Sequence, residues 1–280
     1  MAGPTFVDLA TGWGIDAPAA VAVASTGGLY LVGVRRLAAR GRAWPRARSL
    51  AMAGALAAAV VATQSGVGRY EDQRLWVHMV QHVLLGMVVP LLVVLSAPVT
   101  LALQSGRRAT RQALRTALRS RSARVATHPL VGWSLFGGGL VLLYLTPLLD
   151  VAARHGVVHL AVHMHVVGSG VLFLAPLVGI DALPHRLPHP ARLLALLAAV
   201  PFHAVVGLAM VSSSQPLAPD TYRLLDDQRA AASLFWGAGE LFALVAAAIV
   251  LHQWWAAEQR AILREDRALA AEQRVTSSRG

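Results

Sequence analysis

Two pairs of histidines have the spacing of a metal-binding helix face. His78 and His82 are four residues apart, and so are His159 and His163. Residues at i and i+4 share one face of an α-helix, so the two rings of each pair point the same way. Imidazole nitrogen is a ligand for copper, zinc, iron and nickel. The spacing therefore predicts a metal site formed by these four side chains, and the alternative is that they only pack and form hydrogen bonds.

Several other polar or thioether side chains are candidates to complete or orient this site. Thioether sulfur favours copper(I), and a methionine adjoins a member of each histidine pair. A further histidine and a glutamate occur in later apolar segments, where ionisable groups tend to face the interior of a bundle. We expect copper bound transiently, with additional ligands or supporting groups drawn from His165, His203, Glu240, Met79 and Met164.

Other chemistries lack their residues. The chain has no cysteine, which excludes thiolate ligands and disulfides, and no lysine, which excludes a retinal Schiff base. Residues 78–82 read His-Met-Val-Gln-His, without the glutamate base of a zinc protease. A Gly-x-Ser-x-Gly elbow is also missing from the sequence. We therefore expect a protein that is not an enzyme.

The elements that must position these residues are transmembrane helices. The chain has 280 residues, of which 56% are hydrophobic and only 14% charged, with a mean hydropathy of +0.55. A soluble domain would carry about 25% charged residues. A spanning helix needs about 20 mostly apolar residues. The sequence predicts an all-α fold, a bundle of seven transmembrane helices over residues 18–34, 49–64, 75–95, 130–149, 157–178, 193–211 and 230–251.

The arginines predict the orientation of this bundle. Of the 25 basic residues, 20 fall in the segments that follow the first, third, fifth and seventh predicted spans. Positive charge is enriched on the cytoplasmic side of membrane proteins. The distribution predicts an N-terminus outside and a C-terminus in the cytoplasm. It also argues against nucleic acid as a partner, because the basic residues lie between apolar runs and not on one soluble face.

This orientation places both histidine pairs in the outer half of the membrane. With a rise of about 1.5 Å per residue, the four rings lie roughly 6 to 13 Å below the outer surface. His203 is expected at a similar depth. A shared metal site requires that the third and fifth spans pack side by side, which the sequence does not establish.

The predicted domain organisation is simple. Residues 1–255 form the transmembrane domain, and residues 256–280 form a charged cytoplasmic tail in which acidic and basic residues alternate. The arginine clusters are expected to contact anionic membrane lipids.

Four blocks of the sequence together resemble a known family. They are 76–104 (WVHMVQHVLLGMVVPLLVVLSAPVTLALQ), 28–48, 159–184 with its His-x-x-x-His-x-His set, and the segment from Asp227 through Trp236 and Glu240 to Trp254. In this order they resemble the CtaG-type cytochrome c oxidase assembly factors, multi-pass proteins of the bacterial plasma membrane.

The resemblance implies a role in maturing the copper centre of a haem–copper oxidase. The expected function is that of a metallochaperone in respiratory-chain biogenesis, with the oxidase catalytic subunit and other copper chaperones as partners. Three alternatives remain open at this point. They are a copper transporter, a haem-binding membrane electron carrier, and an assembly scaffold whose histidines are structural.

Overall fold

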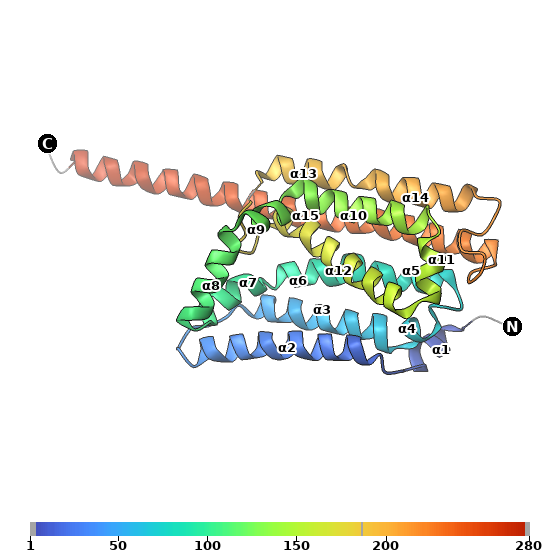
Figure 1. The fold of residues 1–280 in the computed structure, drawn as a ribbon. Coiled ribbons are helices and arrows are strands. Elements are labelled where there is room, and N and C mark those ends of the chain that lie inside the picture. The colour runs from blue at the N-terminus through green and yellow to red at the C-terminus, as the bar shows by residue number, and fades with distance from the viewer. Residues whose placement is uncertain (1–3, 186, 278–280) are drawn as a thin grey trace.

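The computed structural model describes residues 4–185 and 187–277 and is a bundle of α-helices (Figure 1). Arg186 and Arg279, two of the arginines counted above, lie outside the described residues. The described residues contain no β-strand, apart from an isolated bridge between Ala218 and Tyr222. The helix α1 and the C-terminal part of α15 lie at opposite ends of the bundle, as an odd number of membrane crossings requires.

Six segments are long and apolar enough to cross a membrane. They comprise α2 (Ala17–Ala38), α3 (Arg46–Gln64) with α4 (Gly66–Tyr70), the third span described below, α12 (Gly156–Val178), α13 (His189–Leu197) with α14 (Val200–Ser212), and α15 (Leu225–Ser277). A short helix, α1 (Phe6–Thr11), precedes them. The all-helical, multi-pass prediction is confirmed to this extent.

The fourth predicted span is bent. Residues 130–149 were expected to form one helix, but α10 (Pro129–Tyr144) ends five residues earlier, and α11 (Leu148–Arg154) continues at an angle of 79°. The prediction of a continuous helix was wrong because the segment bends at Pro147. A residue that precedes proline is driven out of the α conformation. The bent pair makes a seventh span if it is counted as one crossing.

The third span changes its winding in the middle. It begins as α5 (Leu75–Val83), passes through one π-helical turn, η1 (Leu84–Val88), and continues as α6 (Val89–Leu95) and α7 (Pro98–Ser105). Pro90 has no N–H to donate to the carbonyl four residues earlier, that of Gly86. A π-turn at this place is one of the known local adjustments to such a loss.

The freed carbonyl lies where α12 crosses the third span. A Cβ on Gly170 would lie only 2.5 Å from the Gly86 carbonyl oxygen and 2.7 Å from the Pro90 ring. A Cβ on Gly86 would in turn meet Val166 at 2.9 Å. Small residues let membrane helices approach this closely. Two glycines therefore set the distance between the helices that carry the histidine pairs.

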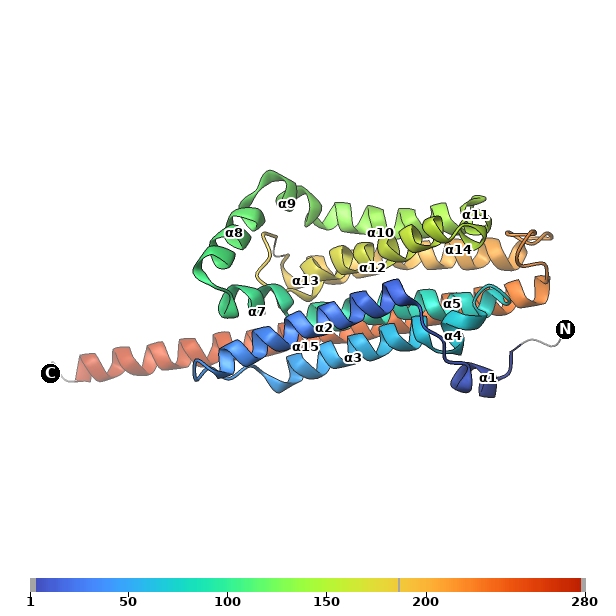
Figure 2. The ribbon, with the colours of Figure 1, turned by 60° about the horizontal axis from the view of Figure 1, so that its bottom comes forward.

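The arginine-rich segments gather at one end of the molecule. The α2–α3 connection, α8 (Arg108–Arg119), α9 (Arg121–Ala126) and the end of α15 lie at that end, and α8 runs across it (Figure 2). The helix α15 continues past the bundle without a break at residue 255 (Figure 1). The boundary predicted there stays a prediction.

At the opposite end, side chains tie the helices together. The Asp227 carboxylate of α15 accepts a hydrogen bond of 2.7 Å from the Leu75 N–H, which caps the first turn of α5. The Tyr222 hydroxyl donates to the Glu71 carbonyl oxygen at 2.8 Å. These contacts fix the loop before α15 over the start of α5.

Replacing Gly170 with alanine should destabilise the fold by about 1–3 kcal/mol, because the added methyl group overpacks the contact with the Gly86 carbonyl. Gly168→Ala is the matched control on the same helix, since a Cβ there meets nothing within 4 Å. The control should be neutral or more stable by up to about 1 kcal/mol, the gain in helix propensity. Thermal unfolding in detergent measures both, and equal melting temperatures for the two variants would contradict the proposed contact.

Candidate metal centre

The packing of α12 against the third span brings both histidine pairs into one cluster. Within each pair the ring centroids are 4.1 Å apart. Across the helices, His78 lies 6.1 Å from His159, and His82 lies 5.6 Å from His163. The four rings, called the histidine quartet below, therefore form a compact group. The contact between the third and fifth predicted spans, on which a shared site depends, is present.

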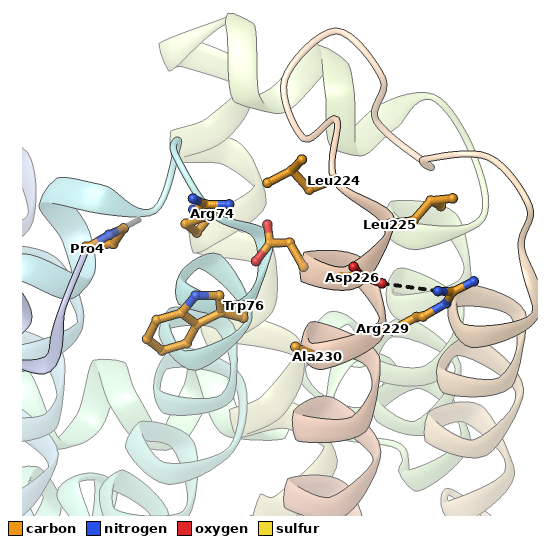
Figure 3. A pocket seen from close by; sticks show the side chains of 9 residues that line it. Pro4, Arg74, Trp76, Leu224, Leu225, Asp226, Arg229 and Ala230 are labelled. Carbon is orange, nitrogen blue, oxygen red and sulfur yellow. Dashed lines mark hydrogen bonds and ion pairs between the residues drawn. The ribbon is translucent and has the colours of Figure 1, made fainter. Parts of the chain in front are cut away.

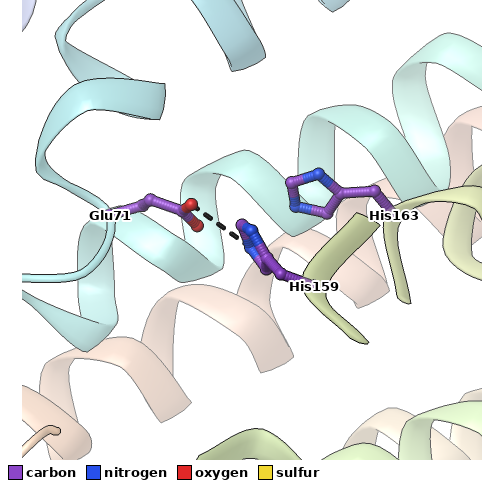
Figure 4. Close-up of side chains that lie close together, drawn as sticks. All are labelled: Glu71, His159 and His163. Carbon is purple, nitrogen blue, oxygen red and sulfur yellow. Dashed lines mark ion pairs between the residues drawn. The ribbon is translucent and has the colours of Figure 1, made fainter. Parts of the chain in front are cut away.

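Glu71 joins the quartet from the turn after α4. His78 Nδ1 donates to one carboxylate oxygen at 3.0 Å, and His159 Nε2 donates to the other at 3.2 Å. Figure 4 shows the carboxylate directed at His159, with His163 farther along α12. One carboxylate thus bridges the two helices that carry the histidine pairs.

The Glu71 carboxyl stays ionised in this position. Burial by itself would raise its pKa, but the hydrogen bonds from His159 and His78 outweigh burial and lower the pKa to about 2. A carboxylate that is negative near neutral pH attracts cations to this end of the bundle.

Two further polar side chains orient the deeper rings. His82 Nδ1 lies 2.8 Å from the Tyr144 hydroxyl of α10. His163 Nε2 donates to Gln81 Oε1 at 3.0 Å, and the Gln81 amide nitrogen donates to the Ala62 carbonyl of α3. Four of the seven candidate spans therefore contribute to the cluster.

The Nε2 atoms of His78 and His82 are buried and have no hydrogen-bond partner. Glu71 can only accept a hydrogen bond, so the His78 ring carries its proton on Nδ1 and leaves a lone pair on Nε2. Metal-binding histidines typically donate their other N–H to a carboxylate or a similar acceptor, which fixes the tautomer. This donor set has the chemistry of a metal site, and leaving such nitrogens buried without a partner costs free energy.

Three of the additional candidates lie apart from the quartet. His165 is exposed and donates to the Leu135 carbonyl of α10 at 3.2 Å. His203 is buried, but its ring neighbours are Phe136 and Phe235. Glu240 accepts a hydrogen bond from the Trp236 indole on its own helix.

The two methionines also face away from the quartet. Met79 is fully buried in an apolar cluster with Leu75, Met87 and Tyr144. Met164 is 68% exposed on the outside of the bundle. The structure therefore gives both methionines the surroundings of packing or membrane-facing residues.

The pocket at the N-terminal ends of α5 and α15 is separate from this cluster. It has a volume of about 660 Å³ and is lined by Arg74, Trp76, Asp226 and Arg229 among others (Figure 3). Arg229 and Asp226 form an ion pair of 3.1 Å across part of its wall. No histidine lines it, so it offers no imidazole for a metal.

Sequence analysis missed Glu71, Gln81 and Tyr144 as members of the site. Helical spacing could not have found Glu71, because this residue lies in the turn between α4 and α5 and belongs to neither helix. Gln81 is a polar residue between the two histidines of an otherwise apolar helix. Tyr144 gave no such signal, because its role depends on how α10 packs.

Comparison with known proteins agrees with the resemblance. Residues 28–257 match the cytochrome c oxidase caa3 assembly factor family (Caa3_CtaG). Uncharacterized proteins of Mycobacterium bovis and Mycobacterium tuberculosis are each 34% identical to this chain over 282 residues, and one of Mycobacterium leprae is 31% identical over 280. These alignments cover 94% of this chain but only 42% of each relative, so the chain spans about two fifths of their length. No solved structure matches the chain.

Replacing Glu71 with glutamine should destabilise the protein by about 1–3 kcal/mol at pH 7, because the amide keeps only one acceptor oxygen for the two rings and turns an NH2 donor toward the other. Asp72→Asn, at the exposed next residue, is the control and should have little effect. Thermal unfolding in detergent provides the comparison.

The difference in stability between wild type and Glu71→Gln should also depend on pH. The folded pKa of Glu71 lies below its ordinary value of 4.5, so its contribution is complete above that value and is lost as the pH falls toward about 2. The difference in melting temperature between wild type and Glu71→Gln should therefore narrow below about pH 4.5. A difference that grows as the pH falls would contradict the assigned ion pairs.

Proposed function

Because the chain belongs to the family of cytochrome c oxidase caa3 assembly factors, we propose that it assists oxidase assembly by holding copper transiently in the histidine quartet. The copper is cargo that passes to the catalytic subunit of the oxidase, and no turnover reaction is involved. The observation that carries the proposal is the pair of buried, unpartnered Nε2 atoms on His78 and His82, faced by two more imidazoles.

The proposal places the quartet in the outer half of a bacterial plasma membrane. Its support is the gathering of the arginine-rich segments at the other end of the bundle, which the positive-inside rule assigns to the cytoplasm. In this orientation the N-terminus is outside and the C-terminus is cytoplasmic. Copper then enters and leaves on the outer side.

The surroundings of the quartet favour holding copper over conducting it. The side chains that follow His82 on the same side of the third span, Leu85 and Val89, pack with Ala62 in an apolar cluster. A cation path to the other side would need polar groups at this level. The quartet is therefore a site with access from one side, which suits a chaperone better than a transporter.

Substituting both His78 and His82 with alanine should abolish the binding of copper(I), because it removes the two free imidazole nitrogens. Tag-free protein is purified in detergent, loaded with copper under ascorbate, desalted and analysed for metal. The matched control is His128→Ala/His185→Ala, which removes another pair of contacting rings, 5.3 Å apart, from the arginine-rich end. Wild type and control should keep near-stoichiometric copper.

The cellular counterpart measures copper in the oxidase. Cells that carry the His78/His82 variant, with normal amounts of the variant protein in the membrane, should contain oxidase deficient in copper. Normal oxidase copper in these cells would rule out delivery from the quartet. A Soret band in the purified wild-type protein would instead favour the haem-binding alternative.

A further inference from the structure

The quartet is not equally accessible on all sides. His78 and His82 are 2% and 5% exposed, whereas the side chain of His159 is 22% exposed and that of Glu71 is 14% exposed. An ion from solvent therefore meets the α12 pair and Glu71 before it can reach the α5 pair.

A pocket of about 280 Å³ opens on this more accessible side. Glu71, His159, His163 and Gln81 line one part of it, and Asp16, at the start of α2, lines another. Arg69 also lines the pocket and holds its guanidinium 5.9 Å from the Tyr70 ring centroid. The pocket thus connects solvent to the carboxylate of Glu71 and the imidazoles of His159 and His163.

These three side chains form a recognisable donor set. One ligand atom from each of Glu71, His159 and His163 can be chosen so that all lie within 4.8 Å of one another (Figure 4). Two imidazoles and a carboxylate, with a fourth position open, are the ligands of many zinc sites. Ligand atoms at about 2.0–2.1 Å from zinc lie roughly 3.3 Å apart, so the donors must approach by about 1.5 Å at most.

We propose that Glu71, His159 and His163 form an outer site that binds a divalent cation from the pocket, distinct from the inner pair His78 and His82. The inference rests on the proposed function in one respect: if the quartet holds copper, the copper passes the outer site before it reaches the inner pair. The outer site contains a hard carboxylate oxygen, whereas the inner pair offers only imidazole nitrogen. Differences of this kind set which metals a site prefers.

Both sites share the bridging carboxylate. Glu71 accepts hydrogen bonds from His159 in the outer site and from His78 in the inner pair. Coordination of a cation by Glu71 and by Nε2 of His159 moves the Nε2 proton to Nδ1 of the same ring, or releases it to solvent, and gives up that hydrogen bond. An occupied outer site is thereby linked to the orientation of His78, the first ring of the inner pair.

Zinc(II) is the probe for the outer site, because it is redox-silent and suits a carboxylate with two imidazoles. Affinity is measured on tag-free protein in detergent by competition with a chelator. We expect Glu71→Gln and His163→Ala each to weaken zinc binding by more than about 10-fold, while His78→Ala/His82→Ala and the control Asp72→Asn stay within about 3-fold of wild type. His163→Ala leaves the Glu71 ion pairs in place, so its loss of zinc binding cannot be ascribed to their disruption.

Three results would overturn the outer site. They are no zinc binding by the wild type, retention of zinc by both Glu71→Gln and His163→Ala, and equal loss of zinc in the His78/His82 variant. The last result would mean that one undivided site uses the whole quartet. Copper(I) loading of the wild type and the His78/His82 variant is scored separately, so the outer site and the copper-holding function can fail independently of each other.

Discussion

The close crossing of α12 over the third span is the constraint on which the candidate site depends. Pro90 has no N–H to donate to the Gly86 carbonyl, and the helix forms a π-turn at this place. Gly170 lets the backbone of α12 approach the carbonyl that is left without this hydrogen bond. On the side of this crossing where α5 begins, the two histidine pairs face each other across the helices and Glu71 joins them. A larger residue at the crossing would separate the rings as well as the helices.

The polar cluster is satisfied by its own members except where a ligand could bind. Glu71 and Gln81 each join a histidine to a second element, and Tyr144 meets His82 from α10. Buried polar groups that lack hydrogen-bond partners lower the stability of a fold. The two unpartnered imidazole nitrogens therefore destabilise the protein unless a ligand binds them. The network also holds the rings in orientations that a flexible pair on one helix could not maintain.

The two ends of the bundle differ in chemistry. The arginine-rich end is covered by α8 and extended by α15, while the other end is closed by contacts of Asp227 and Tyr222 over the start of α5. Near the arginine-rich end, Asp181 accepts hydrogen bonds from the first turn of α7, after Ala97 takes a left-handed conformation. The ends therefore anchor the third span on both sides of the π-turn, so that its histidine face is held at a fixed level.

The sequence by itself determined the class of fold, the alternation of charge and the i,i+4 histidine pairs, because hydropathy, arginine placement and helical periodicity are properties of one segment at a time. The same local reasoning placed His203 near the site by its depth, and Met164 and His165 by their positions in the sequence beside His163. Only the tertiary structure decided that the two pairs face each other and that Glu71 bridges them. These features depend on which helix faces pack together. The depth of a residue in the membrane does not tell toward which neighbouring helix its side chain points.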